Sequence, residues 1–330
     1  MTYQEILDKA LCLSDSERSL LMEALSKSSA KTADSSDGFR LRLLLDKQGR
    51  CPHCGGIHYY RFGKDKGAQR FKCKDCGRTF TQYTGTWEQG LQKKGLVGRY
   101  MRLMSERKSL DKISAALHIN KKTAFDWRHK ILRSLGQDEG RSFSGITESD
   151  ETFFDKSQKG CRHLGRKPRR RGGCCHTRGI SSEKAAVIVT ADRKNDLNMT
   201  FCGYGRLTEK EISDSLKSPL PEGVVLCSDG HPSYCKYASD NHLEHVVLNS
   251  NRGEHVKRTF FHIQHVNSIH GRLKQWISST FHGVATKYLQ DYLNWFKAYQ
   301  TILKRSLDRA EEMLCLSMHT NAEVCNVIIN

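Results

Sequence analysis

The spacing of apolar residues predicts helices in the first half of the chain. Between residues 91 and 135 apolar side chains recur every three or four positions, which is the period of a helix. Two short helices are predicted at 110–117 and 121–132, around a tight turn that ends at Asn120, the expected N-cap of the second helix. This spacing is typical of a helix-turn-helix, so we predict a DNA-binding module over residues 90–136. An ordinary helical hairpin with a solvated basic face is the alternative.

Beyond residue 140 the pattern changes to short apolar runs of strand length that alternate with helical periods. Strands are predicted at 145–154, 185–190, 198–204, 224–228 and 245–248, and helices at 208–216, 234–238, 266–277 and 287–303. Such alternation is typical of an α/β domain, which we place at residues 142–305, followed by a C-terminal tail at 306–330.

The N-terminal part of the chain predicts a small helical unit and a linker. Residues 3–27 carry helical apolar spacing, with Ser14 and Glu17 as a capping box. Residues 26–38 are small and polar, which is typical of a flexible linker, and we treat 1–48 as one N-terminal segment. No apolar run reaches the ~20 residues that a membrane-spanning helix needs.

Four cysteines in two close pairs, Cys51 with Cys54 and Cys73 with Cys76, have the spacing of a tetrahedral zinc site. A glycine follows each pair and allows the tight turn that directs both thiolates to one ion. The residues between the pairs are rich in aromatic and basic side chains, which suits a small β-hairpin that contacts nucleic acid. We therefore predict a zinc ribbon with structural Zn²⁺ over residues 49–82. Four unrelated thiols or two disulfides are the alternatives.

The balance of charge indicates a polyanionic partner. The 330-residue chain has 54 Lys and Arg against 36 Asp and Glu, which gives a net charge of +18. Double-stranded DNA is the first candidate; a membrane surface would also attract such charge, but the missing long apolar run argues against a membrane partner. The first residues show no secretion signal, and thirteen cysteines suit a reducing compartment, so we expect a cytoplasmic, nucleoid-associated protein.

Two groups of residues are candidates for DNA contact. The first lies on the predicted second helix and comprises Lys121, Lys122, Thr123 and Arg128. The second lies in the segment 156–178, which holds nine Lys and Arg and no acid, and comprises Lys167, Arg169, Arg170, Arg171 and Arg178. Beside an active site such a loop would clamp phosphates, whereas a solvated charge run or a localisation tag is the alternative.

Two aspartates stand on apolar strands at positions where α/β folds expose ligands. Asp150 lies in the predicted strand 145–154, and Asp229 directly follows the strand 224–228. Carboxylates at the edges of adjacent strands can jointly hold Mg²⁺ or Mn²⁺, and two such ions can activate a nucleophile and stabilise the leaving oxygen in phosphoryl transfer. An aspartate before a glycine, as at Asp229, is also typical of a simple turn.

The order of these motifs resembles that of the zinc-ribbon-bearing DDE transposases of bacterial insertion sequences, which carry an ISXO-like transposase domain. The resemblance runs from Cys51 to Trp295. Its segments in the α/β part are 150–152, 169–173, 178–180, 191–193, 228–234, 266–276 and 281–289. So many motifs in one order make an accidental similarity improbable.

The resemblance implies a ribonuclease-H-like catalytic domain, a mixed sheet with flanking helices, behind a zinc ribbon and a helix-turn-helix. It implies a DNA transposase that binds terminal inverted repeats, cuts DNA at the element's ends with water and joins the 3′-hydroxyls to target DNA. Mg²⁺ or Mn²⁺ would be the catalytic ion. Pairing two element ends implies a dimer or a larger homo-oligomer.

One position departs from a common pattern of these enzymes. Many DDE enzymes supply a glutamate from a helix after the second aspartate, and the matching position here is His270. On the predicted helix His270 shares a stripe with Asn267 and Lys274, opposite the apolar stripe. The resemblance implies the two aspartates as metal ligands, His270 as third ligand or positioning residue for the nucleophile, and Lys274 as a phosphate contact. Imidazole is a poorer ligand for Mg²⁺ than carboxylate, which favours Mn²⁺.

The sequence leaves other readings of this site open. Glu254 is a second candidate for the third acid, since no glutamate lies between it and Glu311. A plain structural role for His270 and an inactive copy are further alternatives. The rival class of function is a sequence-specific DNA-binding regulator with a catalytically inactive, transposase-derived domain. Both classes bind DNA, and they differ in whether loss of Asp150 or Asp229 abolishes strand cleavage.

Overall fold

A computed structural model describes residues 49–136, 143–165, 179–216, 220–249, 252–304 and 306–318, together with 14, 16–17, 20, 168–169, 173, 175 and 177. The predicted N-terminal helix and linker otherwise lie outside the described residues. The Ser14 N–H donates to Glu17 Oε2 at 2.9 Å and the Glu17 N–H donates to Ser14 Oγ at 3.4 Å, which confirms the predicted capping box. No helix in these ranges is both long and apolar enough to span a membrane.

The chain forms two compact units, residues 1–127 with 308–330, and residues 128–307. The first unit begins with an antiparallel sheet of β1 (Tyr59–Asp65), β2 (Ala68–Cys73) and β3 (Thr79–Thr81). Tyr59, Phe71 and Phe80 pack against each other and against the buried cysteines on one face of this sheet. This core is very small, so the sheet needs further stabilisation to persist in water.

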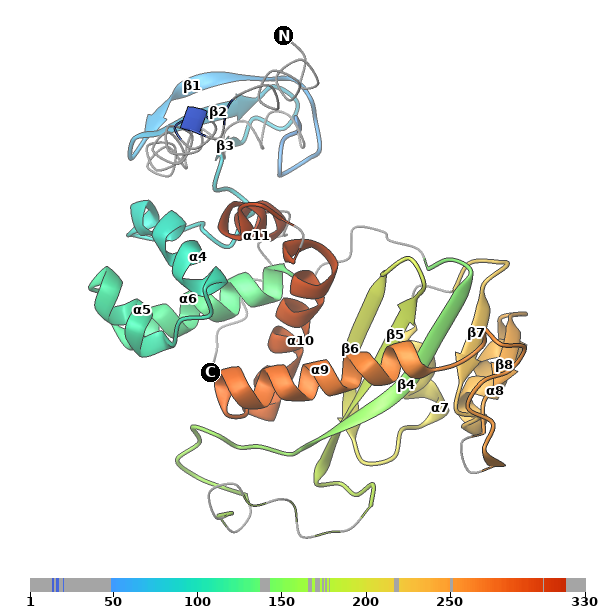
Figure 1. The fold of residues 1–330 in the computed structure, drawn as a ribbon. Coiled ribbons are helices and arrows are strands. Elements are labelled where there is room, and N and C mark those ends of the chain that lie inside the picture. Colours follow the sequence, from blue (N-terminus) through green and yellow to red (C-terminus); the bar gives the residue numbers. More distant parts are fainter. Residues whose placement is uncertain are drawn as a thin grey trace. The chain divides into compact units, whose positions relative to one another are not determined.

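Helices α4 (Val97–Ser105), α5 (Leu110–Leu117) and α6 (Lys121–Ser134) follow a short 3₁₀ turn at Lys94–Leu96 (Figure 1). The predicted helix-turn-helix geometry is present. His118 adopts a left-handed conformation at φ 49°, and Asn120 Oδ1 accepts the Lys122 N–H at 2.8 Å as the predicted N-cap. Ile119 is buried in the turn, as its apolar character requires.

Helix α11 (Arg309–Ser317) corrects the prediction of a plain C-terminal tail. Asp308 caps it by accepting the N–H groups of Ala310 and Glu311 at 2.9 and 3.1 Å. The helix packs on α4 within the first unit, and Trp87 Nε1 donates to Ser317 Oγ at 3.1 Å. The spacing of Ala310, Met313 and Leu314 carried this signal, but it extends over less than three turns.

The second unit is built on a five-stranded sheet in the order β6-β5-β4-β7-β8. Its strands are β4 (Ile146–Asp155), β5 (Lys184–Asp192), β6 (Leu197–Tyr204), β7 (Val225–Ser228) and β8 (Glu244–Val247). The first three strands form an antiparallel meander, whereas β7 and β8 run parallel to β4. This mixed order is that of a ribonuclease-H-like domain. Each of the five predicted strands is confirmed to within two residues at either end.

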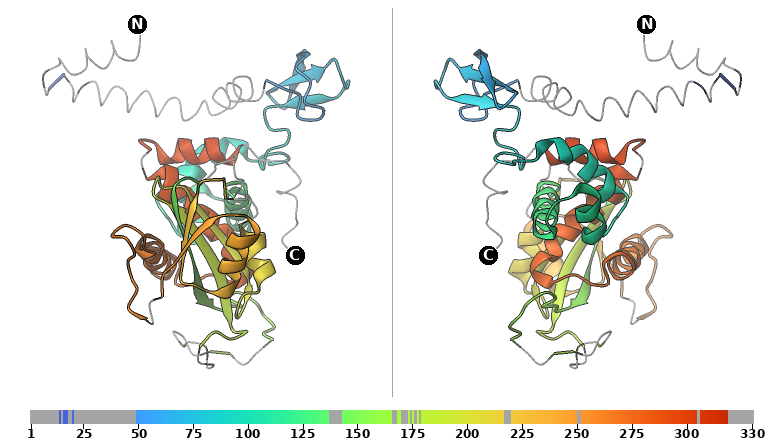
Figure 2. Two further views of the ribbon diagram at one scale, coloured as in Figure 1. Left: turned by 90° about the vertical axis from the view of Figure 1, so that its right-hand side faces the viewer. Right: turned by 90° about the vertical axis from the view of Figure 1, so that its left-hand side faces the viewer.

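Helices cover both faces of this sheet (Figures 1 and 2). Helices α7 (Glu209–Ser215) and α8 (Pro232–Asp240) pack over one face, on Ala186, Ile188 and Leu226. Helix α9 (Gln264–Phe281) lies along the opposite face over β4 and β5, and α10 (Leu289–Ala298) lies over β6. A 3₁₀ turn at Thr286–Tyr288 precedes α10 and a π-helical turn at Tyr299–Leu303 continues it. Because successive side chains of β4 alternate between faces, its even-numbered residues face α9 and its odd-numbered ones face α8.

Candidate active site

The four cysteines of the first unit converge as the spacing predicted. Their Sγ atoms all lie within 4.8 Å of one another, and the pairs Cys51–Cys76 and Cys54–Cys73 are each 3.7 Å apart. Ligands at ~2.3 Å from a tetrahedral zinc ion lie about 3.8 Å apart, so the cage fits Zn²⁺. A disulfide needs about 2.05 Å, and all four cysteines are free, so the disulfide alternative is wrong.

Glycine is required after each cysteine pair. Gly55 and Gly77 have φ angles of +74° and +69°, and their N–H groups donate to the carbonyls of Cys51 and Cys73 at 2.8 and 3.1 Å. Residues with a Cβ rarely adopt this conformation, so the two glycines allow both turns to present their thiolates to one point.

Removal of zinc is expected to unfold residues 49–82, because the aromatic core of the ribbon is too small to hold the sheet alone and structural zinc contributes about 10–16 kcal/mol of binding free energy. Metal analysis of protein purified in reducing buffer should give one Zn²⁺ per chain, and chelation should make this segment sensitive to protease. Cys54→Ser should reproduce the loss, whereas Cys235→Ser, at an exposed cysteine outside the cage, should not. A clearly substoichiometric zinc content would contradict the assignment.

The register of the second sheet brings Asp150 and Asp229 together. Strands β4 and β7 pair in parallel up to Glu148 opposite Cys227, so two residues further along Asp150 stands beside Asp229. Gly230 allows the chain to turn away at once, because its φ is +83° and a Cβ there would collide with Val247 at 2.5 Å. The two aspartates thus lie side by side, as predicted, because β4 and β7 pair in a parallel register. The turn directly after Asp229 leaves its side chain exposed at the end of β7.

Glu151 joins these aspartates, and the prediction from sequence gave it no role. Ligand oxygens of Asp150, Glu151 and Asp229 all lie within 4.8 Å of one another. Adjacent residues of a strand point to opposite faces, but among the described strands none pairs with β4 along this edge beyond its last pair with β7. Side chains from both faces of β4 can therefore bend around its free edge to reach Asp229.

The crowding of carboxylates changes their acidity. Burial, and then the charge of Asp229, raise the pKa of Asp150 to about 7. Burial, followed by the charges of Asp150 and Asp229, raises the pKa of Glu151 to about 7 as well. Near neutral pH the cluster therefore retains protons that a divalent cation would displace.

This gives a pH dependence that can be measured. In the unfolded chain these carboxyls titrate near pH ~4. Between about pH 4 and about pH 7 the folded state therefore binds more protons at Asp150 than the unfolded state does, so its contribution to stability falls as pH rises and levels off above the folded pKa. Asp150→Asn should thus gain stability over the wild type across this range in denaturant titrations without Mg²⁺ or Mn²⁺. A difference that does not change with pH would contradict the shift.

His270 lies beside the cluster, as the resemblance implied, but on the buried side of its helix. It is 8% exposed, and its Nδ1 is 3.9 Å from Asp150 Oδ2. Burial, together with Lys274, lowers the pKa of His270 to about 4, so at neutral pH the ring is uncharged and this contact is not an ion pair. Asn267 and Lys274 are exposed, so the expected shared stripe is wrong for His270. Lys274 is still close enough to lower the pKa of Asp150.

Glu254, the alternative third acid, does not reach the cluster. Its carboxylate pairs with Lys257 at 3.0 Å on the surface, where both side chains are about 40% exposed. The sheet and α9 therefore favour His270 and Glu151 over Glu254 as neighbours of the two aspartates.

Glu148 fixes α9 to the sheet at the level of this cluster. Its carboxylate is fully buried, accepts the Val266 N–H at 3.0 Å, and lies 2.7 Å from Arg193 and 3.4 Å from His262. Val266 is in the first turn of α9, where N–H groups lack helical partners, so Glu148 acts as a cap from another element. Glu148 and Asp150 share one face of β4, and Val266 and His270 share one side of α9. The cap therefore sets the position of His270 against Asp150.

Two of the predicted DNA contacts are corrected by burial. Arg128 is 3% exposed, with its guanidinium over the ring of Trp295, because the end of α6 belongs to the core of the second unit. Arg169 donates to the Lys156 carbonyl at 3.1 Å and lies 3.6 Å from Glu183, with a side chain only 11% exposed.

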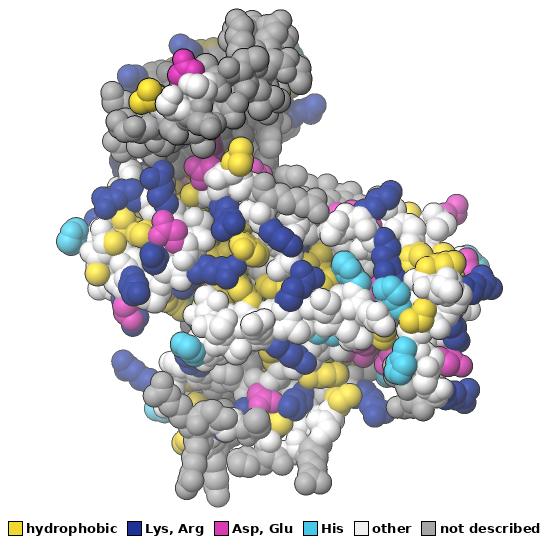
Figure 3. All heavy atoms as spheres, viewed as in Figure 1, with side chains coloured by type: hydrophobic (Ala, Val, Ile, Leu, Met, Phe, Trp, Pro, Cys, Tyr) yellow, Lys and Arg dark blue, Asp and Glu magenta, His cyan; other side chains and the backbone are white. Residues whose placement is uncertain are grey.

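The other predicted DNA contacts are exposed, half-buried or not described. Lys121 and Lys122 are exposed and Thr123 is half-buried. Lys167, Arg170, Arg171 and Arg178 lie outside the described residues. Figure 3 shows Lys and Arg spread over one face of the molecule, with Asp and Glu sparser.

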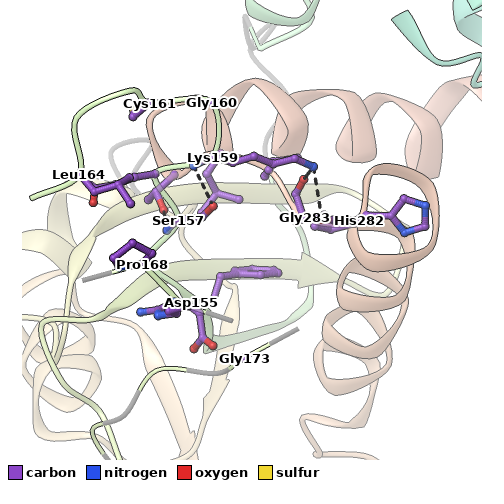
Figure 4. Close-up of a pocket in the computed structure, with 17 residues that line it drawn as sticks. Asp155, Ser157, Lys159, Gly160, Cys161, Leu164, Pro168, Gly173, His282 and Gly283 are labelled. Atoms are coloured by element: carbon purple, nitrogen blue, oxygen red, sulfur yellow. Dashed lines mark hydrogen bonds between the residues drawn. The ribbon is translucent and has the colours of Figure 1, made fainter. Parts of the chain in front are cut away.

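The loop after β4 forms a separate pocket of about 610 Å³ against the end of α9 (Figure 4). Lys159 closes one side, because its Nζ donates to the carbonyls of Phe281, the last residue of α9, and of Gly283 just after it, at 3.0 and 2.9 Å. None of the clustered carboxylates lines this pocket, so it is not the candidate metal centre.

A mixed ribonuclease-H-like sheet that gathers carboxylates where two parallel strands part defines a class of nucleic-acid-cutting domain. Residues 142–300 match the ISXO2-like transposase domain, and this match supports a DDE-type insertion-sequence transposase. The chain is also similar to an uncharacterized protein in transposable element ISH50 of Halobacterium salinarum, at 28% identity over 261 residues that cover 77% of this chain and 86% of that protein.

Two solved structures were also found by similarity of fold. A pre-cleavage Mos1 transpososome has 9% sequence identity and a TM-score of 0.25, and covers 67% of this chain and 78% of its own. The Mos1 mariner paired end complex with Mn has 12% identity and a TM-score of 0.23, and covers 70% and 79%. These scores are too low to add support, and the fold assignment depends on the strand order.

Proposed function

We propose that this chain is a DNA transposase that binds the terminal inverted repeats of its element and catalyses metal-dependent strand cleavage and strand transfer. The observation that carries the proposal is the cluster of Asp150 and Asp229, with Glu151 beside them, where β4 and β7 separate in a domain that matches the transposase family. Three carboxylates within reach of one another are the kind of oxygen ligands that Mg²⁺ and Mn²⁺ prefer.

The residues of the site have separate tasks in this proposal. When bound, two divalent ions would supply an activated hydroxyl nucleophile and stabilise the leaving oxygen. Asp150 and Asp229 would hold these ions, and Asp150, whose pKa is raised to about 7, would release its proton to do so. His270, uncharged at neutral pH, can orient a water molecule or serve as a ligand without adding charge. Lys274, one turn further along α9, presents its ammonium to a phosphate of the DNA.

The exposed start of α6 supports recognition of DNA in this proposal. Lys121 and Lys122 stand at the N-terminus of the second helix of a helix-turn-helix, where such helices approach base edges and phosphates. Lys121 also pairs with Asp111 at 2.7 Å on the surface, an interaction that DNA phosphates can replace at little cost. Bringing two element ends together calls for a dimer or a larger assembly.

The test is a cleavage and joining assay with DNA that carries the terminal repeats flanking the gene. Zinc-loaded protein with Mg²⁺ or Mn²⁺ should nick the repeat at its end and join the 3′-hydroxyl to a target plasmid. The second candidate function, a DNA-binding regulator, shares the helix-turn-helix and predicts specific binding of the repeat without nicking or joining in either metal. That outcome, with intact zinc and folded protein, would overturn the enzymatic proposal.

A further inference from the structure

Glu151 stands at the candidate metal site without a cationic side chain paired to it among the described residues. Its Oε1 is buried and has no hydrogen-bond partner in this part of the chain, although Tyr234 contacts the carboxyl group. Other acids of the same strand are neutralised: Glu148 lies 2.7 Å from Arg193, and Asp155 lies 2.6 Å from Lys184. A buried carboxylate without a cation is costly, so β4 leaves this one uncompensated at a position where a bound cation would compensate it.

His270 on α9 also carries a buried polar atom without a hydrogen-bond partner among the described residues. Its side chain is 8% exposed, and the unpartnered atom is Nε2. The other ring nitrogen, Nδ1, lies 3.9 Å from Asp150 Oδ2. Side chains that each carry an unsatisfied buried atom thus lie beside Asp150, His270 on the α9 face of β4 and Glu151 on the other, and a hydrated cation is the kind of ligand that can satisfy both.

From this geometry we infer that Glu151 is the third carboxylate ligand of the divalent-metal site, in place of the acid that α9 does not provide. The free edge of β4 beyond its pairing with β7 makes this possible, since side chains of both faces reach Asp229 there. His270 then acts as a positioning or neutral ligand group on the α9 side. The inference depends on the proposed function for the identity of the site, but not on strand transfer itself.

The test measures metal binding by the full-length, zinc-loaded protein, so that the ribbon thiolates are already occupied. Mn²⁺ binding, followed by calorimetry and by the electron paramagnetic resonance of free Mn²⁺, should weaken at least tenfold in Glu151→Gln. The matched control Glu254→Gln removes a surface glutamate that pairs with Lys257, and should bind Mn²⁺ as the wild type does. Thermal melting without Mn²⁺ should show that Glu151→Gln folds.

The possible outcomes distinguish failure of the role inferred for Glu151 from failure of the proposed transposase function. Unchanged Mn²⁺ affinity in folded Glu151→Gln overturns the inference, even if the wild type cleaves DNA. Weakened binding in this variant, with a wild type that never cleaves its repeats, supports the inference while the proposed function fails. Should Glu151→Gln not fold, Glu151→Asp keeps the charge but withdraws it by one methylene, and an unchanged affinity in that variant would likewise overturn the inference.

Discussion

Replacing Asp229 with asparagine is expected to abolish strand cleavage and joining, with a loss of about 10³-fold or more in rate, because several kcal/mol of transition-state stabilisation depend on correctly held metal ions. Asparagine keeps the size of the side chain and can still accept the His231 N–H that Asp229 Oδ1 binds at 3.0 Å. The turn after β7 should therefore persist. Single-turnover cleavage of a terminal-repeat duplex in Mg²⁺ and in Mn²⁺ measures the effect.

The control for this variant is DNA affinity. The residues proposed to recognise the repeat, Lys121 and Lys122, lie at the start of α6, far from Asp229 in the sequence, and the substitution leaves Lys274 intact. Binding should therefore stay within about twofold of the wild type at a fixed salt concentration. Asp240→Asn, at the exposed end of α8, should cleave normally. Cleavage by Asp229→Asn at the wild-type rate would remove the carboxylate cluster from the reaction.

Replacing Glu148 with alanine is expected to lower the free energy of unfolding by about 3 kcal/mol, since removing one partner of a buried ion pair leaves the other uncompensated. The low end of the usual range applies, because the Arg193 side chain is 34% exposed and regains water. The Val266 N–H at the start of α9 would also lose its acceptor. Glu148→Gln keeps an acceptor for this group and should lose less.

Chemical denaturation measures this loss, and Glu209→Ala is the matched control. Glu209 pairs with Lys236 at 2.7 Å with both side chains exposed, so its removal should cost less than about 1 kcal/mol. Cleavage should fall in Glu148→Ala even under conditions where the protein is folded, because α9 carries His270. Equal losses of stability for Glu148→Ala and Glu209→Ala would contradict the anchoring role of Glu148.

Most of the described elements in both units were predictable because their patterns are local. Apolar runs such as 224–228 fit buried strands, and the cap at Asn120 is a property of a few neighbouring residues. Helix α11 was not predicted because its apolar pattern extends over less than three turns, which is too short to indicate a helix clearly. Arg128 and Arg169 were misplaced for a related reason. A basic side chain is expected to be solvated when only the sequence is known, but Arg128 is covered by Trp295, far away in the chain. Arg169 contacts the Lys156 carbonyl and Glu183, next to the paired ends of β4 and β5.

The sequence by itself determined the four-cysteine cage, the helix-turn-helix, the order of the motifs and the two aspartates, because each depends on short-range spacing or on the order of residues along the chain. Only the tertiary structure decided which residues surround these aspartates. Glu151 points away from Asp150 in any isolated strand, and it reaches the cluster because the pairing of β4 with β7 ends at Glu148, three residues before Glu151. Glu148 caps a helix that begins more than a hundred residues later. Both relations depend on where separate elements meet, which no local pattern encodes.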